Sequence, residues 1–377
     1  MSENAVPARE AFEASTSRRS IPSLDGLRAV SIMLVILSHL IAGVPESYQR
    51  FWVIQWMLAN GRLGVAVFFV ISGYLITLLL LNELDTTNTI SLRRFYLRRS
   101  LRIFPAFYVF LSVMGILWIT GIIPEHLPSF IAAATYTWAL FPNLQGYYIN
   151  HSWSLSIEEQ FYLIWPFLLR RLRRQRATRF AVGAILCMPL VRFAMYWLTP
   201  GLRGHDGFMV QAWVDTMMIG CLLALLKGPQ WELWKQRHIS HRAAAIVSLL
   251  AFLVLPYLRA LVPGRPGGAF GLILYFSIQP LAIGFVLLYV IRYHDSMVGR
   301  FLNHPVVKHI GVISYSIYLW QQLFTARDRF PAVVALFLIL AVAEISYWMV
   351  ERPALKLRSR LDAWLMSRPS YRYGQQS

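Results

Sequence analysis

Residues 24–40 read LDGLRAVSIMLVILSHL, an apolar stretch that nevertheless carries Asp25, Arg28 and His39. A run of this length and hydrophobicity is typical of a helix that crosses the roughly 30 Å hydrocarbon core of a bilayer. At about 100° per residue the three ionisable residues fall on one narrow face, and Arg28 and His39 lie about 16 Å apart along the axis. Because a charged group inside a bilayer is costly, this face is expected to border a cavity or a partner.

Two of these residues also have a structural interpretation. His39 could simply hydrogen-bond to a neighbouring helix, and Arg28 could extend to lipid phosphates at the membrane surface. The first stretch alone therefore suggests a site without establishing one.

The composition extends the membrane interpretation to the whole chain. Of its 377 residues 57% are hydrophobic and 14% are charged, and the mean hydropathy is +0.50. A soluble domain has about 25% charged residues. Apolar runs of spanning length recur along the sequence and predict an all-α, polytopic integral membrane protein with about ten transmembrane helices, at 28–44, 62–82, 103–123, 153–169, 180–199, 209–226, 243–262, 270–291, 310–325 and 331–350.

The formal charge of +18 and the pI of 10.3 could indicate nucleic-acid binding, but the positions of the basic residues indicate topology instead. One alternating set of predicted loops and tails holds 27 of the 36 Lys and Arg residues. By the positive-inside rule this set, with both termini, is expected in the cytoplasm. We predict a disordered cytoplasmic tail at 1–20 without a cleavable signal peptide, a membrane domain at 21–355 and a basic cytoplasmic tail at 356–377.

Several kinds of chemistry have no support in the sequence. Cys187 and Cys221 lie in predicted spans without a CxxC pattern, so neither a disulfide nor a metal site is expected. The sequence has no HExxH, Walker A or GxSxG motif, which leaves zinc, ATP and nucleophile-elbow chemistry without support. Four further intramembrane charges could stabilise helix packing by pairing with one another: Arg192, Asp215, Arg259 and Glu344.

A glycine-containing stretch, GRLGVAVFFVISGYLIT at 61–77, opens the second predicted span. Small residues such as Ser72 and Gly73 allow another backbone or a ligand to approach closely. Ordinary small-residue helix packing explains the same pattern, so the two interpretations stay open.

A basic stretch, RRFYLRRSLRIFP at 93–105, precedes the third span and contains Arg98, Arg99 and Arg102. The planar guanidinium group suits bidentate binding of phosphate. The alternative is an anchor on anionic lipid head groups.

A mixed stretch, HSWSLSIEEQFYLIWP at 151–166, lies where a span enters from the outer side. Glu158 and Glu159 near a helix start benefit from the positive end of the helix dipole. Capping alone explains them, but two carboxylates beside Trp153 and Ser156 also suit a polyhydroxylated ligand.

Together these stretches resemble the membrane-bound acyltransferase 3 family, bacterial O-acyltransferases that modify surface polysaccharides and other exported glycoconjugates. The matching pieces follow the expected order from the first to the ninth predicted helix: LDGLRAVSIMLVILSH at 24–39, GVAVFFVISGYLIT at 64–77, RRSLRIFP at 98–105, SWSLSIEEQFYLIWP at 152–166 and ISYSIYLWQQ at 313–322. The resemblance implies a multi-pass protein of the bacterial inner membrane that takes acyl groups, usually acetyl, from cytoplasmic acyl-CoA. The acceptor would be a hydroxyl of a saccharide or glycolipid at or beyond the outer face.

By motif match, the resemblance also implies roles for individual residues. His39 would be the catalytic histidine, and Glu158 or Glu159 the carboxylate of the fourth-span motif. The functional arginines would be Arg28, Arg98, Arg99 and Arg102. We expect the last three to hold the phosphates of CoA and the backbone of Ser72 and Gly73 to supply a hydrogen-bond donor for the oxyanion at the thioester. The acceptor is expected to meet Asp25, Trp153, Ser156, Trp320 and Gln321.

Two positions depart from the family pattern. Ala66 stands where the second-span motif often has an acidic residue, and Gln321 follows Trp320 where a histidine is common. The second departure bears on acceptor preference more than on the chemistry. Some relatives carry an added periplasmic hydrolase-like domain. The present chain is expected to differ from them and to end with the membrane domain.

The sequence leaves the mechanism and the class of protein open. His39 could act as general base on the acceptor hydroxyl or form an acyl-histidine intermediate, and Glu159 or Glu158 could orient the histidine or the sugar. A transporter or flippase, an acyl carrier or a non-catalytic sensor is the alternative to an enzyme. Neither nucleic acid nor a metal is expected as a partner, and the oligomeric state is not indicated.

Overall fold

The computed structural model describes residues 21–42, 47, 51–59, 61–141, 143–144, 146–203, 209–326 and 330–367, and these form an all-helical structure. The predicted tail at 1–20 lies outside the described residues, as does the part of the basic tail beyond residue 367. The α-helices are α2 (Leu24–Ala42), α4 (Trp52–Ala59), α5 (Leu63–Thr87), α6 (Leu92–Ile119), α7 (Leu127–Ala134), α8 (Ser152–Leu198), α9 (Val214–Leu225), α10 (Pro229–His238), α11 (His241–Leu249), α12 (Leu255–Ala260), α13 (Gly264–Ile273), α14 (Gln279–Arg292), α15 (Met297–Leu302), α16 (Pro305–Val312), α17 (Ser314–Phe324), α18 (Ala332–Ser346) and α19 (Arg352–Ser367). Shorter 3₁₀ and π turns are η1 (Trp138–Leu140), η2 (Pro200–Leu202), η4 (Val210–Ala212), η5 (Leu250–Val254), η6 (Leu274–Ile278) and η7 (Tyr347–Glu351).

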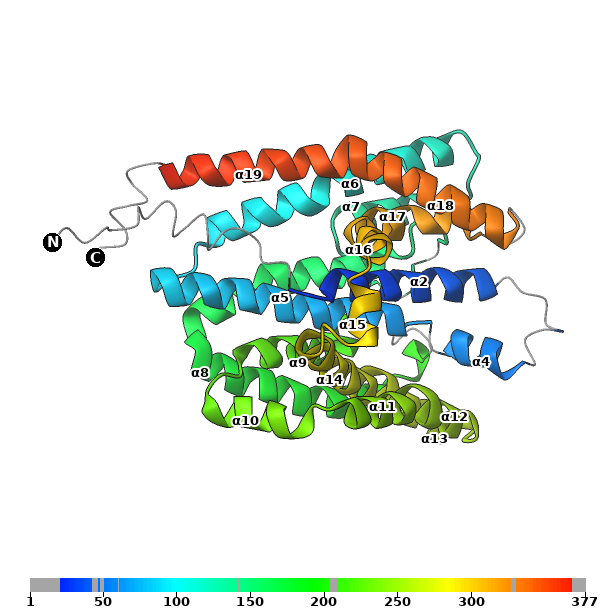
Figure 1. Ribbon diagram of the computed structural model, residues 1–377. Helices are drawn as coiled ribbons and strands as arrows, with labels where there is room; N and C mark the ends of the chain where they lie inside the picture. Colours follow the sequence, from blue (N-terminus) through cyan, green and yellow to red (C-terminus); the bar gives the residue numbers. More distant parts are fainter. Residues whose placement is uncertain are drawn as a thin grey trace.

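Helix α5 runs through the middle of the molecule, between a layer with α6, α18 and α19 and a layer with α9 and α11–α14 (Figure 1). It is apolar on all sides and largely buried, as expected of a helix enclosed by protein. A Cβ atom built on Gly73 would lie 2.1 Å from the carbonyl oxygen of Met217, and one on Gly220 2.1 Å from that of Val70. The glycines therefore let α5 and α9 pack backbone against backbone, which favours the packing interpretation of Gly73.

Seven helical segments of the described chain are long and apolar enough to cross a membrane: Leu24–Ile41, Leu63–Thr87, Leu92–Ile119, Ser152–Leu198, His241–Ala260, Gly264–Arg292 and Ala332–Asp362. The prediction of an all-α protein with several apolar spans is confirmed, whereas the count of ten stays a prediction. Two of the predicted spans fall on shorter elements. Residues 209–226 contain the twelve-residue helix α9, and residues 310–325 divide between α16 and α17.

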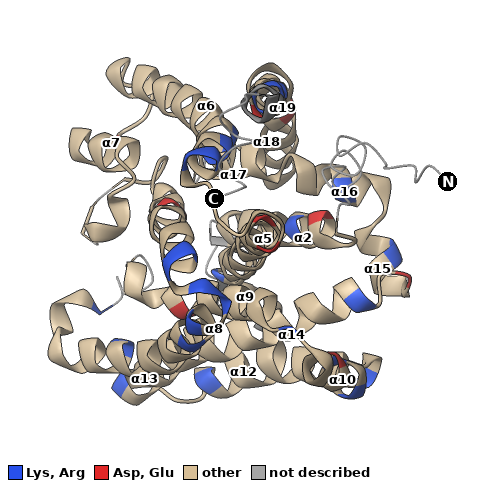
Figure 2. Ribbon diagram, turned by 90° about the vertical axis from the view of Figure 1, so that its left-hand side faces the viewer, with Lys and Arg blue, Asp and Glu red and all other residues tan. Residues whose placement is uncertain are grey.

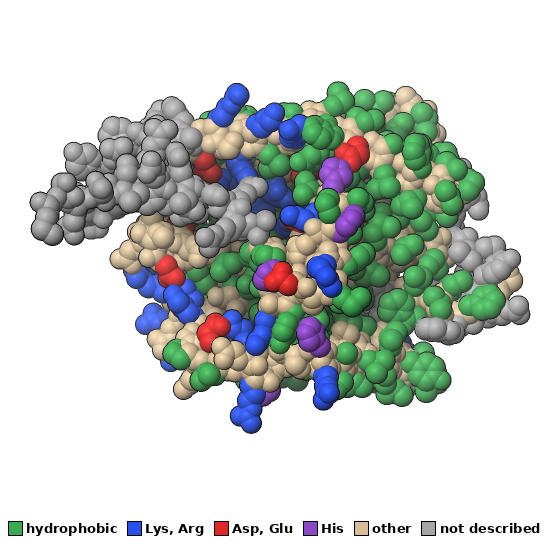
Figure 3. Space-filling model, in the orientation of Figure 1, with side chains coloured by type: hydrophobic (Ala, Val, Ile, Leu, Met, Phe, Trp, Pro, Cys, Tyr) green, Lys and Arg blue, Asp and Glu red, His purple; other side chains and the backbone are tan. Residues whose placement is uncertain are grey.

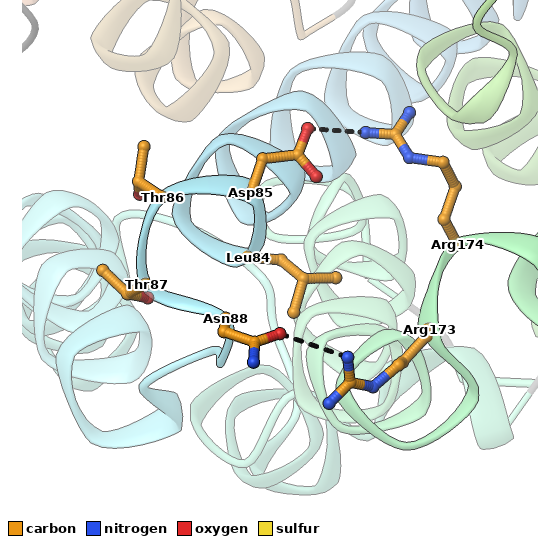
Figure 4. Close-up of a pocket in the computed structure, with 7 residues that line it drawn as sticks. All are labelled: Leu84, Asp85, Thr86, Thr87, Asn88, Arg173 and Arg174. Atoms are coloured by element: carbon orange, nitrogen blue, oxygen red, sulfur yellow. Dashed lines mark hydrogen bonds and ion pairs between the residues drawn. The ribbon is translucent and has the colours of Figure 1, made fainter. Parts of the chain in front are cut away.

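Two further predicted spans, 153–169 and 180–199, lie in the single 47-residue helix α8. Arg173 has φ 56° and ψ 178°, so the helix is kinked there and divides into arms of about 20 and 25 residues, each long enough to cross a bilayer. Arg174 pairs with Asp85 at 2.9 Å and Arg173 donates to Asn88 at 3.2 Å, as Figure 4 shows. These contacts join the kink to the end of α5 and border a polar pocket of about 600 Å³.

Basic residues are unevenly distributed over the structure. Lys and Arg gather at the end seen in Figure 2, among others on α8, α10 and α15, whereas the opposite part of the molecule is mainly hydrophobic (Figure 3). The end of α5, the kink of α8 and the beginning of α6 all lie at this basic end (Figure 1). The distribution agrees with the segregation used to predict topology, and the cytoplasmic location of both termini stays a prediction.

Candidate active site

The predicted polar face of α2 is turned into the protein. Asp25 and Arg28 form an ion pair of 3.2 Å, and Ile32 and Val35 between them and His39 are buried. The His39 residue is partly exposed to solvent. Its Nδ1 atom is buried and has no hydrogen-bond partner among the described residues. One side of α2 therefore carries a cation at one end and an imidazole about three turns away.

Three guanidinium groups meet at the first of these positions. Arg28 from α2 interacts electrostatically with Arg102 and Arg99 from α6, which repel it, and with Asp25, which attracts it. Like charges held together in a poorly solvated environment are stabilised by anionic groups placed between them. We call Arg28, Arg99 and Arg102 the arginine layer.

Glu158 and Glu159 belong to the surroundings of this layer. Glu158 accepts hydrogen bonds from the hydroxyl groups of Ser72, at 2.5 Å, and Tyr162. The guanidinium carbon of Arg99 lies 4.5 Å from the centre of the Tyr162 ring, and Arg99 also attracts Glu159. The Oε1 atom of Glu159 is buried without a partner in the described structure. Glu159 thus offsets part of the charge of Arg99, while Glu158 is held by the hydroxyl groups of Ser72 and Tyr162.

A third carboxylate reaches the arginine layer from a distant part of the chain. Glu351 ends the π-helical turn η7, and only 1% of its surface is exposed. It accepts a hydrogen bond from Ser316 at 3.1 Å and interacts electrostatically with Arg102 and Arg28. Single π turns inside α-helices are frequent at functional sites, and this one directs an acid at two of the three arginines.

The surroundings of His39 are different in kind. Gln321 of α17 is fully buried and interacts with the His39 ring, yet neither of its amide atoms has a hydrogen-bond partner within normal geometry among the described residues. The next residue, Gln322, accepts a hydrogen bond from the backbone N–H of His151 at 3.1 Å and contacts the Nδ1 atom of that ring. His151 in turn interacts electrostatically with His39. We call His39, His151, Gln321 and Gln322 the imidazole layer.

Aromatic side chains enclose the imidazole layer. The ring of Phe110 lies 5.4 Å from that of His151 and 5.3 Å from that of Trp320, whose Nε1 donor is buried without a partner in the described part of the chain. His151 precedes the membrane-spanning segment that begins at Ser152, and its burial lowers the pKa of its imidazole to about 4. At neutral pH this second histidine is therefore uncharged.

Arg98, a predicted site residue, makes contacts that point to a structural role. Arg98 pairs with Glu83 at 3.5 Å and Asp362 at 3.8 Å, away from the arginine layer. These ion pairs give Arg98 a structural role, while the expectation that it acts together with its two neighbours on α6 stays a prediction. Arg98 lies one turn before Arg102 on the same side of α6, and the two side chains meet different acids along η7 and α19.

Two predicted acceptor residues are engaged in packing. Trp153 stacks on Trp213 at 5.6 Å and meets Phe69 edge-on at 6.4 Å. Ser156 donates to the carbonyl of Tyr136 and accepts from the backbone N–H of Ala139, which fastens the segment before α8 to this helix. Of the five residues predicted to meet the acceptor, Trp320 and Gln321 are those that lie around the imidazole layer. Asp25 remains at the arginine layer, paired with Arg28.

Residues that the sequence interpretation left out complete the two layers. His151 and Gln322 form the second half of the imidazole layer, and Tyr162 and Glu351 lie against the arginine layer. His151 opens the stretch at 151–166 and Gln322 closes the stretch at 313–322, so proximity to a motif was their only signal. In the described residues no hydrogen bond joins Glu158 or Glu159 to His39, and the side chain beside His39 is an amide.

The two layers offer complementary chemistry. The arginine layer presents positive charge at the end of α2 that faces the basic end of the molecule, and it suits an anionic, phosphate-bearing ligand. The imidazole layer combines a proton acceptor with buried donors and acceptors that have no protein partner, and such atoms are costly unless a ligand or water meets them. The described residues hold no cluster of His, Cys, Asp and Glu that could bind a metal ion.

Comparison with known proteins identifies relatives of the chain. The Acyltransferase domain family, acyltransferase 3, matches residues 21–350. The chain is 29% identical over 391 residues to the O-acetyltransferase OatA of Staphylococcus aureus strain MRSA252, covering 95% of this chain and 61% of that protein. It is 31% identical over 387 residues to a protein of strain COL named "Putative O-acetyltransferase SACOL0978", covering 94% and 60%. The chain thus spans about three fifths of the length of these curated relatives. No solved structure matches it.

Proposed function

Because the chain belongs to the acyltransferase 3 family, we propose that it transfers an acyl group, most simply acetyl, from cytoplasmic acyl-CoA to a hydroxyl of a surface or exported saccharide or glycolipid. The observation that carries the proposal is the division of one polar interior into two layers on α2. Cations that suit the donor lie at the end of α2 that faces the basic end of the molecule, and an imidazole with unpartnered hydrogen-bonding neighbours lies about 16 Å further along. A multi-pass protein of the bacterial inner membrane suits a donor and an acceptor on opposite sides.

The arginine layer is proposed to bind the phosphates of CoA. Arg28, Arg99 and Arg102 repel one another, and phosphate oxygens between them would relieve this repulsion while accepting charge-assisted hydrogen bonds. The pantetheine arm would then extend along α2 and bring the thioester to His39. Asp25, Glu158, Glu159 and Glu351 would keep the empty layer from carrying its full positive charge.

The chemical step is proposed to use His39 as a general base. The imidazole takes the proton of the acceptor hydroxyl as its oxygen attacks the thioester carbonyl carbon. The tetrahedral intermediate collapses as the carbon–sulfur bond breaks, and the leaving sulfur of CoA takes the proton back from His39. The unpartnered amide nitrogen of Gln321 beside this ring can donate a hydrogen bond to the oxyanion of the intermediate.

The proposal is tested with purified protein in nanodiscs and radiolabelled acetyl-CoA. We expect release of CoA together with label on a pool of bacterial saccharides, and slower CoA release to water when the pool is omitted. Binding of acetyl-CoA without release of CoA under any of these conditions would instead identify a carrier or a sensor. Label that crosses the membrane without being transferred would identify a transporter.

Donor binding yields a prediction about individual arginines. Replacing Arg102 by glutamine should raise the Kd for CoA about 10- to 100-fold, the effect of removing a charge-assisted hydrogen bond. Arg98→Gln should change it by at most about threefold, because this side chain pairs with Glu83 and Asp362. Titration calorimetry in nanodiscs measures the Kd, and the exposed Arg93, as Arg93→Gln, is the matched control on the same helix. An effect of Arg98→Gln as large as that of Arg102→Gln would contradict the assignment.

A further inference from the structure

His151 is the polar group of the interior that the proposed chemistry does not use. Its side chain is 98% buried, since only 2% of its surface is exposed, and its Nε2 atom has no hydrogen-bond partner among the described residues. Gln322 holds the ring from one side, while the rings of Phe110 and Tyr318 meet it edge-on at 5.4 and 5.3 Å. The imidazole is thus fixed in orientation with one nitrogen left unsatisfied.

The hydrogen bonds of Gln322 determine which nitrogen of His151 carries the proton. The backbone N–H of His151 can only donate, so the Gln322 atom that it meets at 3.1 Å is the amide oxygen. The same oxygen contacts Nδ1 of the ring, and Nδ1 must therefore donate as well. In the neutral ring Nε2 is then an acceptor with a free lone pair. Burial, which keeps the imidazole uncharged at neutral pH, supports this assignment.

The location of this acceptor suggests what it binds. His151 interacts electrostatically with His39. Gln322 contacts the His151 ring, and the preceding residue, Gln321, interacts with the His39 ring. An acceptor atom beside the group that deprotonates one hydroxyl is well placed for a second hydroxyl of the same molecule. The acetyl group and the thioester at His39 would not use this acceptor, because neither carries a hydrogen-bond donor.

We propose that Nε2 of His151 accepts a hydrogen bond from a hydroxyl adjacent to the one that His39 activates, so that the site selects acceptors with vicinal hydroxyl groups. His151 is accordingly a positioning and specificity-determining residue for the acceptor. This inference rests on the proposed acyl transfer and adds to it the class of acceptor: a polyol such as a sugar with neighbouring free hydroxyls. Discrimination arises because a buried acceptor stays unpaired when the second hydroxyl is absent.

The experiment uses the full chain in nanodiscs with radiolabelled acetyl-CoA and two simple alcohols as probes. 1,2-Propanediol and 1-propanol share a carbon skeleton and differ by one vicinal hydroxyl, and label in the ester product gives kcat/KM for each. The wild-type protein should favour the diol about 3- to 10-fold, the factor of one neutral hydrogen bond and more than the twofold that a second hydroxyl gives statistically. His151→Asn, whose side chain can replace Nδ1 but not Nε2, should reduce the ratio to two or less.

Two comparisons keep the test independent of folding. His241 also bonds through its ring Nδ1, to the hydroxyl of Tyr289 at 2.9 Å, but lies on α11, so His241→Asn should keep the wild-type ratio. A wild-type ratio of two or less would overturn the proposal whether or not His151→Asn folds. Failure of the wild-type protein to acylate either alcohol would overturn it as well. Retention of the diol preference in His151→Asn would overturn it as well. Binding of acetyl-CoA without any release of CoA would refute the proposed function itself, whereas His39-dependent release without a diol preference would refute only the subsite.

Discussion

His39→Ala is expected to lower the rate of acetyl transfer about 10²- to 10⁴-fold, the contribution typical of a positioned general base. The substitution removes the imidazole that lies on the same face of α2 as Arg28 and that is partly exposed to solvent. It leaves the arginine layer about 16 Å away unchanged, so the Kd for acetyl-CoA should stay within about twofold of the wild-type value. Turnover is measured as CoA release with the saccharide pool, and binding by calorimetry on the same preparation.

His309→Ala is the matched control for this experiment. His309 lies on α16 and pairs with Glu344 on a partly exposed surface, with 46% of its side chain accessible, so its removal should leave the rate unaltered. The assignment of His39 fails if His39→Ala turns over as fast as the wild type. It also fails if the variant loses acetyl-CoA binding and rate together, since that outcome places His39 in donor binding or in folding.

The sequence was most informative where function depends on residues close together in the chain. Arg28 and His39 share a helix, so the 3.6-residue period alone predicted that they lie on one face. The same reasoning could not separate Arg98 from Arg102. Their partners, Asp362 and Glu351, lie about 260 and 250 residues away in the sequence, and only the folded structure lays the segment that carries these acids along α6, where each acid meets a different arginine.

His151 shows the same limit at the other layer. It stands at the start of a recognisable motif, but its significance depends on Gln322, which is 171 residues away in the sequence. The sequence did show that Gln321 replaces a common histidine, and only the structure shows that another imidazole lies in the same layer. Long-range pairing of this kind leaves no periodic signal in a single sequence.

The limits of the helices were predictable only in part. Hydropathy located the apolar segments, because burial in lipid or protein requires them, but it carried no information on where the backbone departs from the α-helix. The kink at Arg173 and the π turns η5, η6 and η7 depend on local hydrogen bonding. Helix α9 begins directly after Trp213, whose ring packs against those of Phe69, Trp153 and Phe276, and such long-range contacts are not visible in hydropathy.

The largest effect on stability is expected from the buried pair Arg192 and Asp215, which the sequence had suggested as partners. Two parallel hydrogen bonds of 2.8 and 2.7 Å join their side chains, which are 3% and 1% exposed. Ser277 donates to the carboxylate at 3.2 Å, and the carbonyl of Ala212 accepts from the guanidinium group at 3.2 Å. The pair thereby connects the second arm of α8, the first turn of α9 and the π turn η6.

Removing one member of such a pair leaves the other buried without a counter-charge, which costs about 3–5 kcal/mol. Asp215→Leu should be the more damaging change, because a carboxyl group left alone can take up a proton whereas a guanidinium group cannot lose one. Arg192→Leu should therefore lower the free energy of unfolding somewhat less, and the double variant should recover most of the loss, since a well-packed apolar pair can replace a buried ion pair at little cost. Equilibrium unfolding in detergent measures all three variants. Single variants within about 1 kcal/mol of the wild type, or a double variant in which the two losses simply add, would show that the pair does not hold these three elements together.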